Sequence, residues 1–257
     1  MKLGGMRGTS VHNTIENFFM PTISIAPTDR VFVLTGAGIS AESGLPTFRA
    51  EDGLWAGNRI EDVCTPDAWE RNPELVWQFY SARRAAGAKA QPNPAHFALA
   101  ELEKQIGDRF FLCTQNVDDL HERAGSTRLI HMHGELNKAH CEHECGEPPV
   151  EDHSNYASLA EVGHCTCGGR LRPHIVFFGE IPLELDRIQR EIARATLMLV
   201  VGTSGSVYPA ASFVHWAKQS GARTVYIGPE PPLNAHAFTH VVEGKAGEVL
   251  PSLFQIL

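Results

Sequence analysis

Six short apolar runs, separated by helix-like segments, dominate the pattern of this 257-residue chain. Runs of this length without polar alternation are typical of strands that are buried on both faces of a parallel sheet. The pattern therefore predicts an α/β fold in which helices cover both faces of a parallel sheet. The runs are Val31–Leu34, Phe110–Cys113, Leu129–Met132, Ile175–Phe178, Leu197–Val201 and Thr224–Ile227.

Small and polar residues directly follow each apolar run. Open parallel sheets bind ligands beyond the carboxyl ends of their strands. Here those ends carry glycine, serine, threonine, asparagine, aspartate and histidine, so we expect one composite crevice built from several loops. The segments are 35–38, 114–118, 133–135, 179–180, 202–206 and 228–230.

Two regions fit the sheet pattern poorly. Residues 54–90 look helical, because Asn72-Pro73-Glu74 has the form of a helix start. Residues 134–172 are rich in Cys, His, Glu and Gly and show no apolar periodicity. We expect this second segment to lack a hydrophobic core of its own and to need another source of order.

Two close cysteine pairs offer that source of order. Cys141 and Cys145 form the first pair, and Cys165 and Cys167 form the second. The arrangement favours a structural zinc site, in which four thiolates leave no open position for water. A set of reduced, unliganded thiols is the alternative. The histidines near enough in the sequence to replace a thiolate are His140, His143 and His164.

Composition excludes some classes of function. A formal net charge of −8 argues against non-specific nucleic-acid binding, which needs a basic surface. No apolar stretch approaches the roughly 18 residues of a membrane span. Residues 1–27 have no basic region followed by an apolar core, so we expect a loosely ordered leader rather than a signal peptide. The expected location is the cytoplasm, and the sequence predicts no oligomeric state.

A glycine turn, TGAGIS at residues 35–40, follows the first apolar run. Glycines let the backbone approach a pyrophosphate, which free N–H groups can then hold. A tight strand–helix turn without a ligand is the alternative. The loop 43–49 would bring Phe48 and Arg49 beside the phosphates, where arginine can pair with phosphate and phenylalanine can exclude water.

Polar side chains at two other strand ends are candidates for the chemistry. Asn116 and Asp118 can hold a ribose or recognise a carboxamide, whereas an Asx-type turn or a helix N-cap at Asp118 is the structural alternative. His133 is suited to act as a general base near neutral pH. His131 shares its strand face by period two, so spacing does not choose between the two histidines.

Together these motifs resemble the sirtuin family of NAD-dependent protein deacylases, and in particular class III members of the bacterial type. The matching phrases occur in the family's order and cover nearly the whole chain beyond about residue 28. They are GAGISAESGLPTFRA (36–50), TQNVDDLHERAG (114–125), HMHGEL (131–136), the paired cysteines, RPHIVFFGE (172–180) and GTSGSVYPAA (202–211).

The resemblance implies an NAD-dependent protein-lysine deacylase that acts on acetyl, succinyl and malonyl groups. Such an enzyme transfers the acyl group from lysine to ADP-ribose and releases nicotinamide. It implies NAD and zinc as cofactors, and acylated proteins or peptides as partners, with no membrane or direct nucleic-acid partner. The implied Rossmann-like domain comprises residues 28–53, 91–133 and 173–257, and the helical insert 54–90 and the zinc module 134–172 form a small domain.

The resemblance also implies roles for single residues. His133 would be the general base, chosen over His131 by the family's His-Gly phrase, with Asn116 and Asp118 as further catalytic residues. The implied NAD contacts are Gly36, Ala37, Gly38, Ser40, Ala41, Thr47, Phe48, Arg49, Trp55, Gln115, Asn116, Val117, Asp118, Gly202, Thr203, Ser204, Gly228, Pro229, Glu230 and Ala246. The implied substrate contacts are Tyr80, Arg83, Val176, Phe177, Phe178, Gly179, Val207 and Tyr208.

Acyl specificity is implied by Tyr80 and Arg83, which match the Tyr-x-x-Arg phrase of class III sirtuins. Three residues apart on a helix they share one face, and together they can bind a terminal carboxylate. The residues alone favour a helix-terminal arginine beside a core tyrosine. Thr47 and the small Cys64 agree with class III, because many deacetylase-type members carry Asp at the first position and class III members tend to keep a small residue at the second.

Two features depart from the family pattern. The cysteine spacings are irregular, and Gly228 lacks the side-chain amide of the asparagine that members often carry there. Two other functions remain open: ADP-ribosyl transfer at the same NAD site, and a non-catalytic NAD-binding scaffold. The presence of His133 disfavours the scaffold, and the presence of Tyr80 and Arg83 disfavours the transferase.

Overall fold

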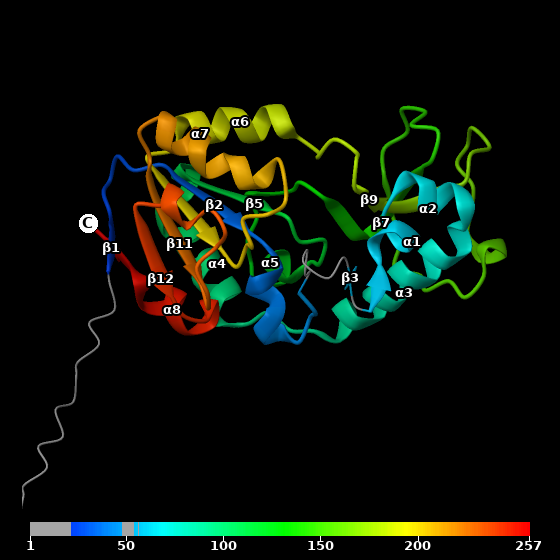
Figure 1. Cartoon of the computed structure of the whole chain (residues 1–257), viewed down its shortest axis with the longest axis horizontal. Helices are drawn as coiled ribbons and strands as arrows, with labels where there is room; N and C mark the ends of the chain where they lie inside the picture. The colour runs from blue at the N-terminus through cyan, green and yellow to red at the C-terminus, as the bar shows by residue number, and fades with distance from the viewer. Residues whose placement is uncertain (1–21, 48–53, 56) are drawn as a thin grey trace, which may run out of the picture.

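A six-stranded parallel sheet forms the centre of the computed structural model, which describes residues 22–47, 54–55 and 57–257. The strand order is β12-β11-β10-β2-β5-β6. It places β2, the first of these strands along the chain, in the middle, as in a doubly wound Rossmann sheet. Figure 1 shows helices above and below the sheet, which confirms the predicted fold class. The strands are β2 (Val31–Thr35), β5 (Phe110–Thr114), β6 (Leu129–His131), β10 (Leu197–Val201), β11 (Arg223–Gly228) and β12 (His240–Glu243).

Alternate residues of the central strands enter two separate cores. Val31 and Val33 of β2 pack on the face covered by α4 (Pro94–Ile106) and α8 (Ala246–Leu253). Phe32 and Leu34 pack on the face covered by α6 (Leu185–Arg194) and α7 (Phe213–Gln219). Burial on both faces explains why these strands have no polar alternation.

A smaller lobe stands beyond one end of the sheet, at the right of Figure 1. Its two longer helices are α2 (Pro66–Arg71) and α3 (Pro73–Lys89). Each begins with a side-chain cap followed by proline at the first helical position, a pairing that fixes a helix start. The Asn72 side chain accepts a hydrogen bond from the Leu75 amide, as the predicted helix start at Asn72-Pro73-Glu74 requires.

The cysteine-rich segment folds into a three-stranded antiparallel sheet against α3. Its central strand is β7 (Gly134–Cys141), flanked by β8 (Val150–Glu151) and β9 (Leu171–Ile175). As expected, this segment has no hydrophobic core of its own, because Leu136 and Ala139 pack with Trp77 of α3 in a core that the two segments share.

The predicted strand at Ile175–Phe178 is wrong. β9 ends at Ile175 and pairs with β7, and the chain then leaves as a connection between the lobes. The Val176 amide donates to the His133 carbonyl and the Phe178 amide to the Cys64 carbonyl, at 3.0 and 2.9 Å. The apolar run reflects burial of Ile175 and Phe177 in the small lobe rather than membership of the main sheet.

The remaining strands pair outside the two larger sheets. β1 (Ile23–Ile25), which falls inside the predicted leader, pairs in parallel with β13 (Phe254–Ile256). In the described part of the chain, no helix is long and apolar enough to cross a membrane. The other elements are β3 (Leu54–Trp55), β4 (Asn58–Arg59), α1 (Ile60–Val63), α5 (Leu120–Arg123), and the 3₁₀ helices η1 (Ala37–Ser43), η3 (Gly107–Arg109), η4 (Leu159–Glu161), η5 (Ala210–Ser212) and η6 (Ala235–Ala237).

Candidate active site

A cavity of about 620 Å³ lies between the carboxyl ends of the sheet strands and the smaller lobe. Segments 36–40, 115–118, 175–180 and 202–208 line it together with His133. From β2 the following strands are added on one side of the sheet, and from β10 they are added on the other side. The cavity therefore opens at the switch point of the sheet, between β2 and β10. It corresponds to the composite crevice that the sequence predicts.

The glycines of the first turn are required by a close backbone contact. The Gly38 amide donates to the Gly202 carbonyl at 2.9 Å. A Cβ atom at Gly38 would lie 2.6 Å from Gly202 Cα, and one at Gly202 would lie 2.5 Å from the Ile39 amide nitrogen. Only glycine fits either position, so the turns after β2 and β10 meet back to back at the floor of the cavity.

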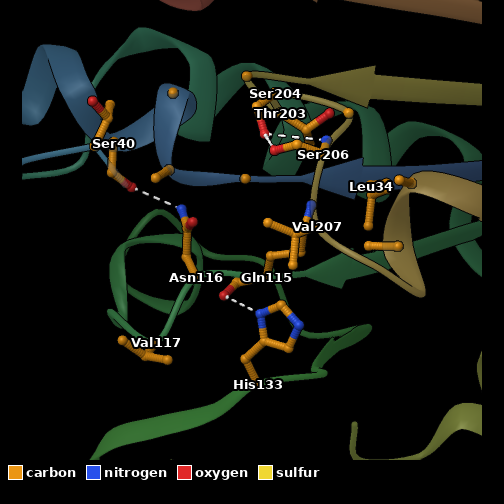
Figure 2. Close-up of a pocket in the computed structure, with 18 of the residues that line it drawn as sticks. Leu34, Ser40, Gln115, Asn116, Val117, His133, Thr203, Ser204, Ser206 and Val207 are labelled. Atoms are coloured by element: carbon orange, nitrogen blue, oxygen red, sulfur yellow. Dashed lines mark hydrogen bonds between the residues drawn. The ribbon is translucent and has the colours of Figure 1, made fainter. Parts of the chain in front are cut away.

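Ser40 joins the two polar side chains that follow β5. Its hydroxyl donates to Asp118 Oδ2 at 3.1 Å. It also accepts from Asn116 Nδ2 at 3.1 Å, the bond that Figure 2 shows. Asp118 Oδ1 also accepts the Leu120 amide at 3.2 Å, so the Asx-type turn and the cavity contact coexist. This chain of bonds fixes the Asn116 amide with its nitrogen toward Ser40. In the described part of the chain, no hydrogen bond engages Asn116 Oδ1.

The two histidines at the end of β6 differ in their free nitrogens. His133 lines the cavity, and its Nδ1 lies 3.1 Å from the Gln115 carbonyl oxygen (Figure 2). A carbonyl only accepts, so Nδ1 carries hydrogen and Nε2 keeps a lone pair. His131 lies outside the cavity, with Nδ1 2.8 Å from the Asn116 carbonyl and Nε2 2.6 Å from Glu122 Oε1. Only His133 therefore offers a free basic nitrogen to a ligand.

The pKa values of these histidines move in opposite directions. Burial lowers the pKa of His133 below its ordinary value, and the hydrogen bond to the Gln115 carbonyl only partly offsets this. Burial also disfavours the His131 cation, but the hydrogen bond and charge of Glu122 outweigh it and raise the pKa of His131. Burial raises the pKa of Asp118, against the hydrogen bonds from Leu120 and Ser40. At neutral pH His133 is thus neutral and available as a base.

Arg83 is the cationic group at the far end of the cavity. Its guanidinium carbon lies 4.9 Å from the ring centroid of Trp55 and 5.2 Å from that of Phe79. Within the described residues, it has no carboxylate partner and no hydrogen bond. Burial lowers the pKa of Arg83, the expected effect on a cation held between aromatic rings without a counter-ion.

Tyr80 lies one turn before Arg83 but is fully buried and does not line the cavity. Its hydroxyl donates to Cys64 Sγ at 3.1 Å, and Cys64 does line the cavity. Burial and the neighbouring Cys64 thiol raise the pKa of Tyr80, so it remains a neutral donor. The small Cys64 side chain therefore accepts the Tyr80 hydroxyl and itself forms the cavity wall at this point.

Gly228 stands behind an aromatic ring at the opposite end of the cavity. A Cβ atom at Gly228 would lie 2.3 Å from Tyr226 Oη, so the ring occupies the space that a side chain there would need. Tyr226 lines the cavity and donates to the Thr203 carbonyl at 3.2 Å. Burial and the nearby Glu230 raise the pKa of Tyr226 to about 12.

Most of the residues that the resemblance implies line this one cavity. Phe48 and Arg49 fall outside the described residues. Four others do not line it: Ala41 is exposed on η1, Ala246 is buried at the start of α8, Gly228 is covered by Tyr226, and Tyr80 is covered by Cys64. Lining residues that sequence reasoning missed include Leu136, Tyr226 and Asn234. None of these three interrupts a pattern, so no sequence signal marks them.

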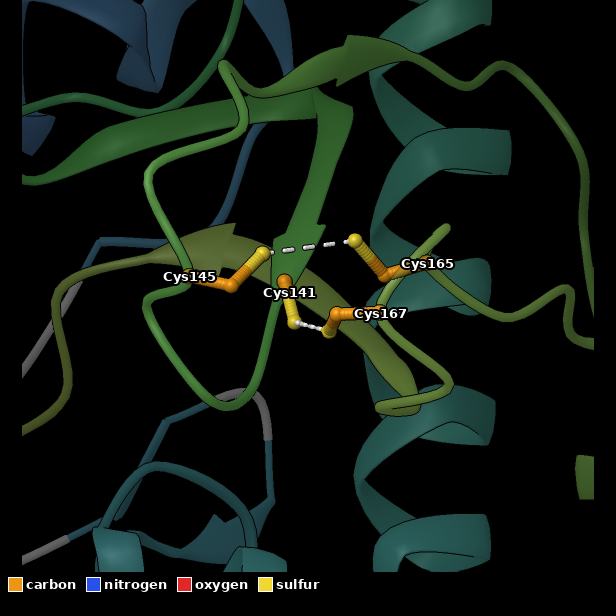
Figure 3. A group of neighbouring side chains, drawn as sticks. All are labelled: Cys141, Cys145, Cys165 and Cys167. Atoms are coloured by element: carbon orange, nitrogen blue, oxygen red, sulfur yellow. Dashed lines mark hydrogen bonds between the residues drawn. The ribbon is translucent and has the colours of Figure 1, made fainter.

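Four cysteine sulfurs gather at the tip of the smaller lobe (Figure 3). Cys141 and Cys167 sulfurs are 3.4 Å apart, and those of Cys145 and Cys165 are 3.5 Å apart, too far for disulfides. Thiolates at about 2.3 Å from a tetrahedral zinc lie about 3.8 Å from one another. The four groups fit such an ion despite their irregular spacing, and the candidate histidines are not in the group that the described residues form.

A family model described as the Sir2 family matches residues 36–209. Among curated proteins, an NAD-dependent protein deacylase of Escherichia coli strain K12 is 50% identical over 231 residues, which cover 89% of this chain and 82% of that protein. An NAD-dependent protein deacylase of Caulobacter vibrioides is 51% identical over 226 residues, covering 87% of this chain and 94% of that protein.

Solved structures agree with these sequence matches. A Sir2 homolog in complex with NAD shares 43% identity and a TM-score of 0.79, covering 88% of this chain and 89% of that one. A complex described as Sir2, a p53 peptide and NAD⁺ shares 32% identity and a TM-score of 0.73, covering 86% of this chain and 90% of that one.

Proposed function

From the premise that this chain belongs to the Sir2, or sirtuin, family and is an NAD-dependent protein deacylase, we propose that it removes succinyl and malonyl as well as acetyl groups from protein lysines. The observation that carries this proposal is Arg83, a cation in the cavity wall without a carboxylate partner among the described residues. A half-buried cation held between aromatic rings without a counter-ion is unfavourable unless a ligand supplies the opposite charge. A terminal carboxylate on the acyl group would do so.

NAD fits the cavity between Arg83 and Tyr226. The close turns at Gly38 and Gly202 place backbone at its floor, and Asn116 Oδ1 is free within the described residues to accept a hydrogen bond. We assign the diphosphate to the first turn, and the ribose and nicotinamide to Gln115, Asn116 and Asp118. When bound, NAD supplies an electrophilic ribose carbon, with nicotinamide as the leaving group.

We assign the role of general base to His133. The Gln115 carbonyl holds hydrogen on Nδ1, which leaves Nε2 to take a proton from a ribose hydroxyl. The lowered pKa of His133 keeps that nitrogen unprotonated at neutral pH. Ser40 and Asp118 hold the Asn116 amide in one orientation, so the polar groups are arranged before a ligand binds.

The partners that we propose are acylated lysine-containing proteins or peptides. Phe178 and Tyr208 both line the cavity and are exposed, on the segments 176–179 and 207–208. An extended peptide laid between them would place its acyl-lysine side chain in the cavity, a strand-addition mode of recognition. The cytoplasmic location remains a prediction, as does the division into two domains at the stated boundaries.

The test is an NAD-dependent assay on one peptide sequence carrying acetyl-, malonyl- or succinyl-lysine. Replacing Arg83→Met should lower kcat/KM for the two acidic acyl groups roughly 10- to 100-fold, since a charge-assisted hydrogen bond contributes about 1.5–3 kcal/mol. Deacetylation should change little. The matched control is Arg190→Met, an exposed arginine on α6 that should leave all three rates unchanged.

The products separate the alternatives. Free lysine with O-acyl-ADP-ribose, found by mass analysis, supports deacylation, whereas ADP-ribose attached to the peptide would favour the transferase. If Arg83→Met lowers the three activities equally, Arg83 serves the fold and the acidic-acyl proposal is rejected.

A further inference from the structure

Glu122 and His131 form a closely bonded pair just outside the cavity, and the catalytic assignments above do not use it. The imidazole of His131 spans the 2.8 Å contact to the Asn116 carbonyl and the 2.6 Å contact to Glu122 Oε1. The His131 side chain is 7% exposed, while that of Glu122 is 37% exposed. The pair thus connects the surface of α5 to the loop that follows β5.

The hydrogen-bond partners of His131 determine the protonation state of this pair. A backbone carbonyl only accepts hydrogen bonds, so Nδ1 of His131 carries hydrogen. An ionised carboxylate also only accepts, so Nε2 carries hydrogen too. His131 is therefore an imidazolium paired with a carboxylate. The pKa directions agree, because the Glu122 contact raises the pKa of His131, and the His131 contact lowers that of Glu122 against the effect of burial.

Three hydrogen bonds hold Asn116, two at its backbone and one at its side chain. Its carbonyl accepts from His131, its amide donates to Thr114 Oγ1 at 3.0 Å, and its side chain donates to Ser40. Asn116 is buried, so a lost partner leaves its carbonyl without a hydrogen bond. Of these three hydrogen bonds, only the one from His131 joins Asn116 to a charged group.

The same cation also acts on Asp118. The charge of His131 lowers the pKa of Asp118, opposing the larger effect of burial. An ionised Asp118 accepts the Ser40 hydroxyl, and that hydroxyl then accepts the Asn116 amide. His131 therefore stabilises Asn116 from both ends, through its carbonyl and through the Asp118–Ser40 bond.

We propose that the Glu122–His131 ion pair positions the loop 115–118, so that Asn116 and the Gln115 carbonyl that orients His133 are held ready for the cofactor. His131 is a positioning residue in this proposal, since it touches neither cofactor nor substrate. The proposal rests on the assignment of the NAD site made above. It gives the two histidines at the end of β6 different roles, because His131 is a fixed cation and His133 is a neutral base.

Deprotonation of His131 should loosen the loop. A neutral ring would have to give up the Asn116 carbonyl or turn a lone pair toward the Glu122 carboxylate. Because the contact with Glu122 raises the pKa of His131, the cation persists to higher pH than that of an ordinary histidine and is lost on the alkaline side. The other charged or titratable groups facing His131 are His121 on α5, Asp118 after β5, Glu135 on β7 and His174 on β9.

The first test is nitrogen-15 NMR of the histidine rings in the whole chain, with the signals assigned through His131→Leu and His133→Ala. His131 should show two protonated nitrogens at pH 7, and His133 one. Replacing Glu122→Gln should lower the pKa of His131, and Glu135→Gln is the matched control that should lower it less, because Glu135 acts on His131 through its charge alone and is bonded to Lys138 at 2.9 Å. A neutral His131 ring at pH 7 in the wild-type protein would overturn the proposal. This readout does not depend on activity, so it stands apart from the acyl-specificity test.

The second test is the pH profile of kcat/KM for NAD. The alkaline fall should move to lower pH in Glu122→Gln, while the acidic fall that belongs to His133 stays in place. His131→Leu should lower kcat/KM for NAD about tenfold across the pH range, with the KM for acyl-peptide unchanged and the melting temperature within a few degrees of wild type. Unaltered profiles in both variants, or equal losses for NAD and peptide, would show that the pair serves only the fold.

Discussion

At the scale of single residues, neighbours of the same type have different tasks in this protein. Arg84 is buried and gives its hydrogen bonds to the Leu136, Lys138 and Ser154 carbonyls and to Asp152. Arg83, the next residue, has no such partner in the described part of the chain. The sequence places both on one helix, and only the packing of β7 against α3 decides which arginine holds the fold and which faces the cavity.

His133 provides a prediction at this scale. Because its pKa is lowered, kcat/KM should stay constant through neutral pH and fall only below about pH 6.5, as protonation removes the Nε2 lone pair. His133→Ala should lower deacylation about 10²- to 10⁴-fold, the usual contribution of a general base. Calorimetry should show NAD binding within a few-fold of wild type. Substantial turnover by His133→Ala would show that another group takes the proton.

At the scale of elements, burial explains which strands the sequence reveals. Five of the six apolar runs are strands of the main sheet, because covering both faces removes polar alternation. β12 escapes detection, since His240, Val241 and Glu243 are exposed on an edge strand and only Val242 is buried. The failed strand at Ile175–Phe178 is as apolar as the true ones, but only Ile175 and Phe177 are buried, in the core of the small lobe.

The cysteine-rich element gives a second prediction. Metal analysis should find about one zinc per chain, and removal by a chelator should loosen the loops 142–149 and 163–169. β7 and β9 should remain protected from hydrogen exchange, because they pack on α3 independently of the thiols. Cys167→Ser should reproduce the chelator effect, while the neighbouring Thr166→Ala should not. A metal-free protein with the same exchange pattern would rule out the zinc site.

At the scale of the whole molecule, the sequence predicts the sheet and the crevice better than the details of its walls. Residues at strand ends such as Asn116 and His133 are marked by their place after an apolar run. The choice between His131 and His133 needs the positions of the Gln115 and Asn116 carbonyls, which no spacing supplies. Tyr226 over Gly228 is likewise invisible, because an aromatic residue in an apolar run looks like ordinary core.

The pairing of β1 with β13 gives a prediction for the molecule as a whole. Removing residues 254–257 would leave β1 unpaired and uncover Ile23, which is buried beside Phe254 in the same core. The loss of a few backbone hydrogen bonds and this apolar contact should lower the melting temperature by about 5 °C or more, at about 2–4 °C per kcal/mol for a chain of this size. Activity at low temperature should persist, since the cavity lies elsewhere. Gln255→Ala, which keeps the backbone pairing, is the control, and an unchanged melting temperature in the shortened chain would show that the pairing adds no stability.

That same pairing also sets an order of events during synthesis on the ribosome. β1 is among the first described segments to emerge, yet its partner β13 is among the last. β2 likewise has only β5 beside it until β10 has been made. The nascent chain must therefore carry open strand edges until β13 has been made, and the contact between β1 and β13 can form only after the whole sheet between them has left the ribosome.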